Sequence, residues 1–95
     1  MMNRYETIFI IDTEIGEENV QATVQKFKTL LETSAQLESI DEWGKRKLAY
    51  LIDDKSEGYY VYANFSALPT FPHELERIYK ITEGILKFLV INKDK

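Results

Sequence analysis

Residues 59–67, which read Tyr-Tyr-Val-Tyr-Ala-Asn-Phe-Ser-Ala, decide the fold of this chain. Successive side chains of a strand point to opposite faces, so this segment divides into two sets. The apolar set is Tyr59, Val61, Ala63, Phe65 and Ala67. The second set is Tyr60, Tyr62, Asn64 and Ser66. The alternation predicts a strand with one face in the core and the other half-exposed.

Before this strand, the chain shows a strand pattern and then a helix pattern. Residues 5–11 (YETIFII) are a compact β-branched and aromatic run, which predicts a buried strand. Residues 12–16 (DTEIG) predict a turn. Residues 17–33 carry a helical stripe formed by Val20, Val24, Phe27, Leu30 and Leu31. A strand, a turn and a helix of about four turns are therefore expected here.

The remaining segments complete a regular alternation. Residues 36–52 are mostly extended, and Gly44 inside them predicts a bulge or kink. Residues 53–58 are polar and predict a hairpin connection. Thr70 is expected to cap a short helix that ends near Ile81, and residues 85–91 predict the last strand.

The order of these elements is strand, helix, strand, strand, helix, strand. With right-handed crossovers, it predicts an α+β ferredoxin-like β-α-β-β-α-β sandwich. In this fold, a four-stranded antiparallel sheet has two helices on one face and leaves the other face free. The fold alone does not set the function, but a free sheet face is a possible binding platform.

Length and composition limit what the protein can do. The chain has 95 residues, so residues 1–95 are expected to form a single domain. It has no cysteine and one histidine, His73, which excludes thiolate catalysis, cysteine-ligated zinc and multi-histidine metal sites. No apolar run reaches the ~18 residues of a membrane span, and the N-terminus lacks signal-peptide features. We therefore expect a cytoplasmic protein with no membrane partner.

No arrangement of residues typical of catalysis is found. The four glycines are isolated, so the sequence contains no glycine-rich phosphate loop. His73 falls in the first turn of a short predicted helix, where a surface or capping role is favoured over general-base catalysis. A small enzyme or ligand sensor on this fold would need convergent polar groups in a pocket, and the sequence offers no candidate. We expect no enzyme, no metal, no cofactor and no small-molecule substrate.

Binding to a macromolecule remains, and the charges indicate where it could occur. The net charge of −4 argues against nucleic-acid binding by bulk electrostatics. Lys45, Arg46 and Lys47 form the only run of three consecutive basic residues, which is either a solvated strand edge or a local phosphate contact. The face of Tyr60 and Tyr62 could stack on single-stranded RNA bases, as in a stand-alone RNA-recognition module, or bury against a protein.

Residues 43–50 (WGKRKLAY) are more specific than the rest of the chain. The pattern Gly-x-Arg-x-Leu-Ala-Tyr in the second strand resembles the signature of the bacterial small-subunit ribosomal protein S6 family. Its members are similar at the opening Arg-Tyr-Glu of residues 4–6, at the Gly-Tyr-Tyr of residues 58–60, and in the last strand. The resemblance covers nearly the whole chain, in register. It departs at Leu51, where the family commonly has proline, and at Lys87, where it typically has arginine.

The resemblance implies a structural constituent of the ribosome. It implies binding to the central domain of small-subunit ribosomal RNA together with ribosomal protein S18, as a pair that joins the assembling subunit. The residues expected on the RNA side are Arg4, Lys45, Arg46, Lys47, Lys87 and Lys93. Those expected to have conformational and packing roles in the motif are Gly44, Leu48, Ala49 and Tyr50.

The acidic balance suggests a way in which the partner protein would be recognised. A protein with a net charge of −4 would bind RNA weakly alone and would need a basic partner. The residues expected to contact that partner are Glu38, Asp41, Tyr60 and Tyr62.

Overall fold

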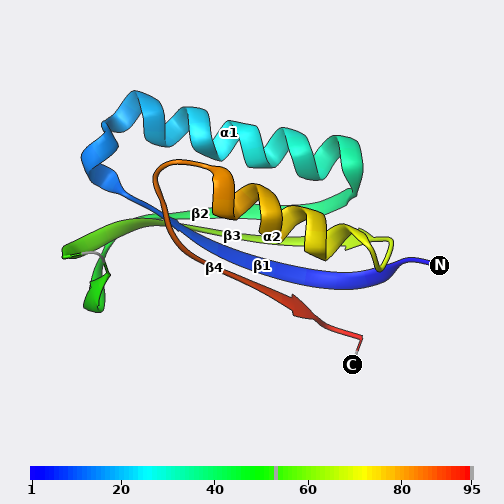
Figure 1. Cartoon of the computed structure of the whole chain (residues 1–95). Coiled ribbons are helices and arrows are strands. Elements are labelled where there is room, and N and C mark those ends of the chain that lie inside the picture. The colour runs from blue at the N-terminus through cyan, green and yellow to red at the C-terminus, as the bar shows by residue number, and fades with distance from the viewer. Residues whose placement is uncertain (53, 95) are drawn as a thin grey trace.

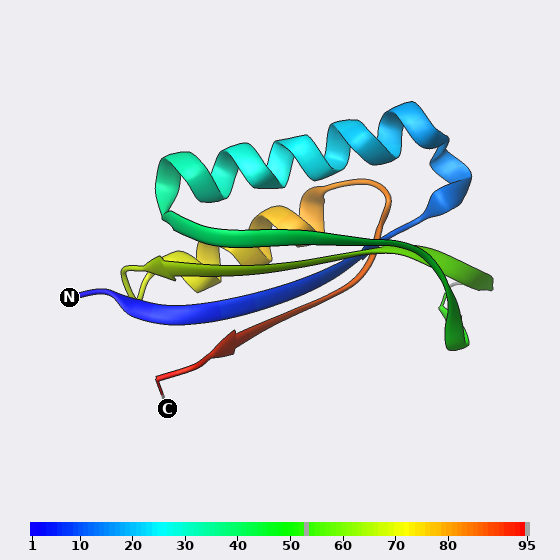
Figure 2. The same cartoon turned by 180° about the vertical axis from the view of Figure 1, so that it is seen from behind.

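The computed structural model describes residues 1–52 and 54–94 and shows two layers (Figure 1). The first layer is an antiparallel sheet with strand order β2-β3-β1-β4. Its strands are β1 (Asn3–Ile11), β2 (Gln36–Ile52), β3 (Lys55–Ala67) and β4 (Ile85–Asn92). The second layer is formed by α1 (Glu17–Ser34) and α2 (Phe71–Ile81), which lie on one face of the sheet (Figure 2). The expected ferredoxin-like fold is confirmed.

Helix α1 buries the apolar stripe that its sequence predicts, and α2 likewise buries one side against the sheet. The buried residues of α1 are Val20, Val24, Phe27 and Leu31, and those of α2 are Phe71, Leu75 and Tyr79. Glu17 and Glu18 occupy the first turn of α1, where the positive end of the helix dipole stabilises negative charge. Both helices are therefore amphipathic, and each buries its apolar side against the sheet.

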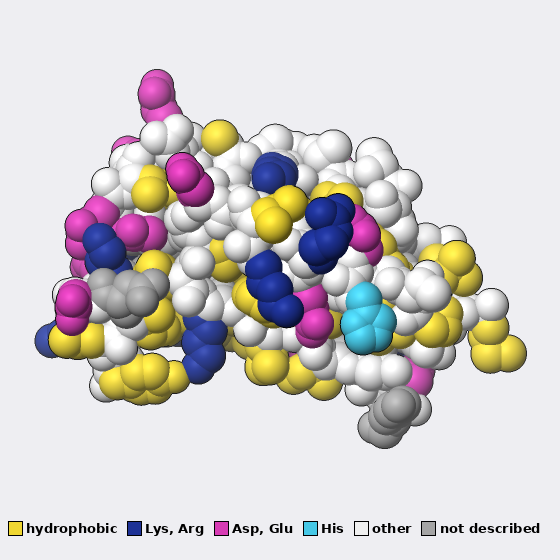
Figure 3. Space-filling view, in the orientation of Figure 1, with side chains coloured by type: hydrophobic (Ala, Val, Ile, Leu, Met, Phe, Trp, Pro, Cys, Tyr) yellow, Lys and Arg dark blue, Asp and Glu magenta, His cyan; other side chains and the backbone are white. Residues whose placement is uncertain are grey.

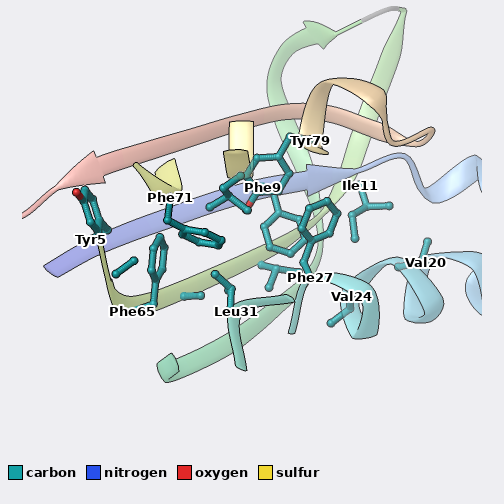
Figure 4. Close-up of a cluster of buried hydrophobic side chains, with 14 residues drawn as sticks. Tyr5, Phe9, Ile11, Val20, Val24, Phe27, Leu31, Phe65, Phe71 and Tyr79 are labelled. Atoms are coloured by element: carbon teal, nitrogen blue, oxygen red, sulfur yellow. The ribbon is translucent and has the colours of Figure 1, made fainter. Parts of the chain in front are cut away.

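The centre of the core is aromatic (Figure 4). The Phe9 ring lies 5.1 Å from the Phe27 ring and 5.3 Å from the Tyr79 ring, and Phe27 stacks on Tyr79 at 4.6 Å. The Thr7 hydroxyl donates a hydrogen bond to the Leu89 carbonyl at 2.9 Å and accepts one from the Tyr79 hydroxyl at 2.9 Å. The buried hydroxyls are thus satisfied, and they join α2 to two strands.

β2 is a long edge strand with interruptions in its pairing. Its register with β3 shifts between Glu42 and Gly44, so Trp43 is the additional residue of a bulge. Gly44 has a φ of 83°, a left-handed conformation that a side chain would disfavour. The predicted bulge at Gly44 is confirmed, and it sets the direction of the Trp43 side chain.

The prediction of a connection over residues 53–58 was wrong in its length. β3 already begins at Lys55, because Glu57 pairs with Lys47 and Gly58 pairs with Arg46 in the antiparallel ladder. Backbone pairing across the hairpin outweighs the turn preference of these polar residues. Asp53, which was part of this prediction, lies outside the described residues.

Thr70 occupies the N-cap position of α2, as predicted, but its side chain does not cap the helix. Its backbone is helical, with φ −82° and ψ −19°, and its side chain makes no capping hydrogen bond. A capping side chain needs an extended backbone at this position. The Phe71 amide instead donates to the Leu68 carbonyl at 3.0 Å, so a backbone turn begins the helix.

Candidate binding face

The sheet has an open face, which we define as the side away from both helices (Figures 1 and 2). In β1 and β3 it carries Arg4, Glu6, Ile8, Ile10, Tyr60, Tyr62, Asn64 and Ser66. In β4 it carries Lys87, Leu89 and Ile91. The register places these residues together, because Ile8 pairs with Tyr62 and Ile10 pairs with both Tyr60 and Lys87. The half-exposed set predicted for residues 59–67 is confirmed on this face.

The residues predicted to bind RNA do not all lie on the open face. Arg46 pairs with Gly58 in the register of the open face, whereas Lys45 pairs with Tyr59 and Lys47 pairs with Glu57 in that of the helix side. Arg4, Lys87 and Lys93 join Arg46 on the open face. The run of three basic residues therefore divides between two sides of the sheet, as strand alternation requires.

Several of these basic side chains already have partners. Arg4 forms an ion pair with Asp94 at 3.2 Å, and Lys45 forms one with Glu57 at 3.8 Å. The backbone amide of Arg4 also donates to Asp94, and this bond lowers the pKa of the Asp94 carboxyl. Within residues 1–52 and 54–94, no carboxylate forms an ion pair with Arg46. Arg46 is thus a better candidate for a phosphate contact than Arg4 or Lys45.

An aromatic stack at the bulge is the feature that sequence reasoning missed. The Trp43 ring lies parallel to those of Tyr62 and Tyr60, at 5.5 and 6.4 Å. The Arg46 guanidinium lies 5.2 Å from the centre of the Trp43 ring, on the open face. Trp43 remains 37% exposed. The available signal was an aromatic residue directly before the glycine of a predicted bulge.

The residues predicted to contact a partner protein surround this stack. Asp41 accepts a hydrogen bond from the Trp43 indole at 3.1 Å, and Glu38 accepts one from the Ser66 hydroxyl at 2.7 Å. Tyr62 donates to Glu6 at 2.6 Å, and this bond raises the pKa of Tyr62. Glu38, Asp41, Tyr60 and Tyr62 thus share the open face. Trp43 already stacks on both tyrosine rings, so a base would compete with it for those ring faces.

The paired ends of β2 and β3 curve away from the helices and towards the open face (Figure 1). Tyr50 in this hairpin accepts a hydrogen bond from Lys87 at 2.6 Å, and the bond raises the pKa of Lys87. Of the motif residues, Leu48 is buried, while Ala49 and Tyr50 are exposed. Beside the hairpin, Ile8, Tyr60 and Leu89 line a depression of about 230 Å³. The open face is therefore concave at its hairpin end.

In the described part of the chain, no group of acidic or histidine side chains is arranged to hold a metal ion. His73, on α2, is exposed and far in the fold from the open face. Among the described helices, none is long and apolar enough to cross a membrane. The site is a broad surface of aromatic, apolar and charged groups, and such a surface fits a macromolecule.

Comparison with known proteins also indicates a protein that works with other macromolecules. The family model described as ribosomal protein S6 matches residues 4–92. Small ribosomal subunit protein bS6 of Clostridium novyi is 46% identical over 95 residues, covering 99% of this chain and 100% of the relative. The bS6 protein of Thermoanaerobacter pseudethanolicus is 47% identical with the same coverage. The crystal structure of 30S ribosomal protein S6 from Thermotoga maritima superposes with a TM-score of 0.91 at 27% identity, covering 99% of this chain and 90% of that one.

The fold, the open face and these matches define a structural protein of the small ribosomal subunit. Within that class, the chain belongs to the ribosomal protein S6 family, and the resemblance seen in residues 43–50 is confirmed. It associates with ribosomal RNA and other ribosomal proteins in the cytoplasm, and its family is a structural one rather than one of enzymes.

Proposed function

We propose that this protein joins the assembling small subunit by binding the central domain of its ribosomal RNA together with ribosomal protein S18. The observation that carries the proposal is the composition of the open face. Arg46 and Lys87 lie at its hairpin end, and Glu38 and Asp41 lie along β2 on the same side of the sheet. One surface thus offers cations to RNA and carboxylates to a basic protein.

The RNA contact would be small and directed. The planar guanidinium of Arg46 can hold a phosphate through two hydrogen bonds, whereas Lys87 acts as a point charge. The Trp43 ring supports the Arg46 guanidinium at 5.2 Å and limits its freedom. With a net charge of −4 on the whole chain, we expect few phosphate contacts and weak binding without a second protein.

The partner contact would combine charge with apolar area. Leu89 and Ile91 are 51% and 39% exposed on the open face, on β4, and Ile8 of β1 lies between Leu89 and Tyr62. Glu38 and Asp41 can steer a basic partner towards this surface, and burial of the apolar side chains then supplies affinity. S18 is the partner that we assign to it.

The test is to measure binding to a central-domain RNA fragment with and without S18, over a series of salt concentrations. We expect tight binding only when both proteins are present, with a salt dependence that gives the number of phosphates engaged. If the protein alone binds short single-stranded oligonucleotides as tightly as it binds the central-domain fragment, the RNA-recognition alternative is favoured. No binding by a folded protein in either case would contradict the proposal.

A further inference from the structure

The β2–β3 hairpin is fastened to the rest of the protein on the helix side of the sheet. Lys55, at the start of β3, donates to Glu14 at 2.8 Å and lies 3.6 Å from Asp12. Both carboxylates belong to the turn after β1, which contains the short helix η1 (Thr13–Ile15). Asp12 also accepts a hydrogen bond from the Glu14 amide at 2.9 Å, so the two acceptors are held in place.

The same hairpin is fastened on the open face by different chemistry. Ile10 fills the space that a side chain at Gly58 would take, and Leu48 is buried beside both residues. Tyr50 accepts the hydrogen bond from Lys87. Lys55 and Leu48 thus hold opposite sides of one hairpin, and a two-sided attachment restricts its rotation about the sheet edge.

The acidic turn also makes two basic residues of the hairpin differ, because it compensates the charge of Lys55 and not that of Arg46. Figure 3 shows acidic side chains gathered at the end of the molecule where η1 and the start of α1 lie. Lys55 is only 26% exposed and faces two carboxylates, so its charge is compensated locally. The hydrogen bond to Glu14 raises the pKa of Lys55, which stays protonated at neutral pH. Arg46 has no such partner among the described residues.

We propose that Lys55, with Glu14 and Asp12, is a positioning element that holds the hairpin so that Arg46 is presented to RNA, while Lys55 itself contacts no phosphate. This inference rests on the proposed RNA binding. It has an unusual consequence for Glu14. If only net charge mattered, removing a carboxylate near the basic hairpin would strengthen RNA binding. If Glu14 positions the hairpin, the same change weakens it.

The experiment compares Glu14→Gln with Glu18→Gln, a matched loss of one carboxylate in the exposed first turn of α1. Lys55→Met and Lys55→Arg test the other partner. Two quantities are measured for each variant: amide hydrogen exchange of residues 46–57, and affinity for the central-domain RNA fragment with S18 over a salt series. The first needs no RNA and reports on the attachment alone.

We expect Glu14→Gln and Lys55→Met to speed exchange in the hairpin and to weaken RNA binding, each about two- to five-fold, the range of a partly exposed ion pair. In both variants the salt slope of RNA binding stays unchanged. Lys55→Arg keeps hydrogen exchange and RNA affinity at the wild-type values, and Glu18→Gln does not weaken RNA binding. Unchanged exchange in Glu14→Gln, or tighter RNA binding by it, overturns the inference. If the wild-type protein binds no RNA, the proposed function fails, while hydrogen exchange still shows whether the attachment exists.

Discussion

Replacing Gly58 by alanine tests how closely the hairpin packs on the open face. A Cβ built at Gly58 would lie closer than 3.0 Å to Ile10 Cγ2, a distance that side chains do not tolerate. Forcing an extra methyl group into a packed site costs about 1–3 kcal/mol. The loss of glycine flexibility in the unfolded chain returns about 0.4–1 kcal/mol, because Gly58 does not need a positive φ. We expect a net loss of about 1–2 kcal/mol.

The free energy of unfolding is measured by urea titration, followed by circular dichroism and by the fluorescence of Trp43. At this chain length, the expected loss lowers the Tm by about 5–15 °C. The double variant Gly58→Ala with Ile10→Ala removes the obstructing methyl group, so it should be more stable than the sum of the single changes predicts, by about 1 kcal/mol or more. Wild-type stability in Gly58→Ala, or simple additivity in the double variant, would refute the reasoning.

Three further predictions concern the open face and the core. Arg46→Glu should weaken RNA binding by the complex with S18 at least about ten-fold and lower the salt slope of binding by about 1, while the circular dichroism stays native. Lys47→Glu should weaken RNA binding less, because Lys47 lies on the helix side of the sheet. Loss of folding in Arg46→Glu would assign it a structural role instead. Reversing Glu38 and Asp41 to lysine should slow association with S18 at low salt and matter little at high salt, and an unchanged rate at low salt would exclude these carboxylates from steering. Burial raises the pKa of Tyr79 above its ordinary 10.0, so the stability that protonated Tyr79 contributes is complete below pH 10 and falls by about 1.4 kcal/mol per pH unit above it. Tyr79→Phe should remove this part of the pH dependence of the free energy of unfolding. An equal pH dependence in both proteins would contradict the assignment.

The fold could be predicted from sequence because each element has a clear period. The alternation in β3 and the apolar stripe of α1 each determine which side is buried, so the helices pack with their apolar sides on the apolar face of the sheet. The errors lie where polar residues are used unexpectedly. The start of β3 at Lys55 depends on backbone pairing with β2 across the hairpin, which the polar sequence of these residues does not indicate. Thr70 fails as a cap because a backbone turn takes its place.

The binding face was predictable only in part. Strand alternation places Tyr60 and Tyr62 together, and it also separates Arg46 from Lys45 and Lys47, although consecutive basic residues suggest a single patch. The position of Trp43 depends on a bulge, where alternation is interrupted. Its stacking on both tyrosines therefore follows from the geometry of the β2–β3 pairing and not from the residue pattern.

The central claim is that the open face, and not the helical face, meets RNA and S18. The most direct measurement is methyl NMR of protein labelled at isoleucine and leucine, free and in the complex with S18 and central-domain RNA. Ile8, Leu89 and Ile91 report on the open face, and Leu30 and Ile81 report on the helices. The claim predicts large shift changes for the first three and small ones for the other two. Changes confined to Leu30 and Ile81 would contradict it.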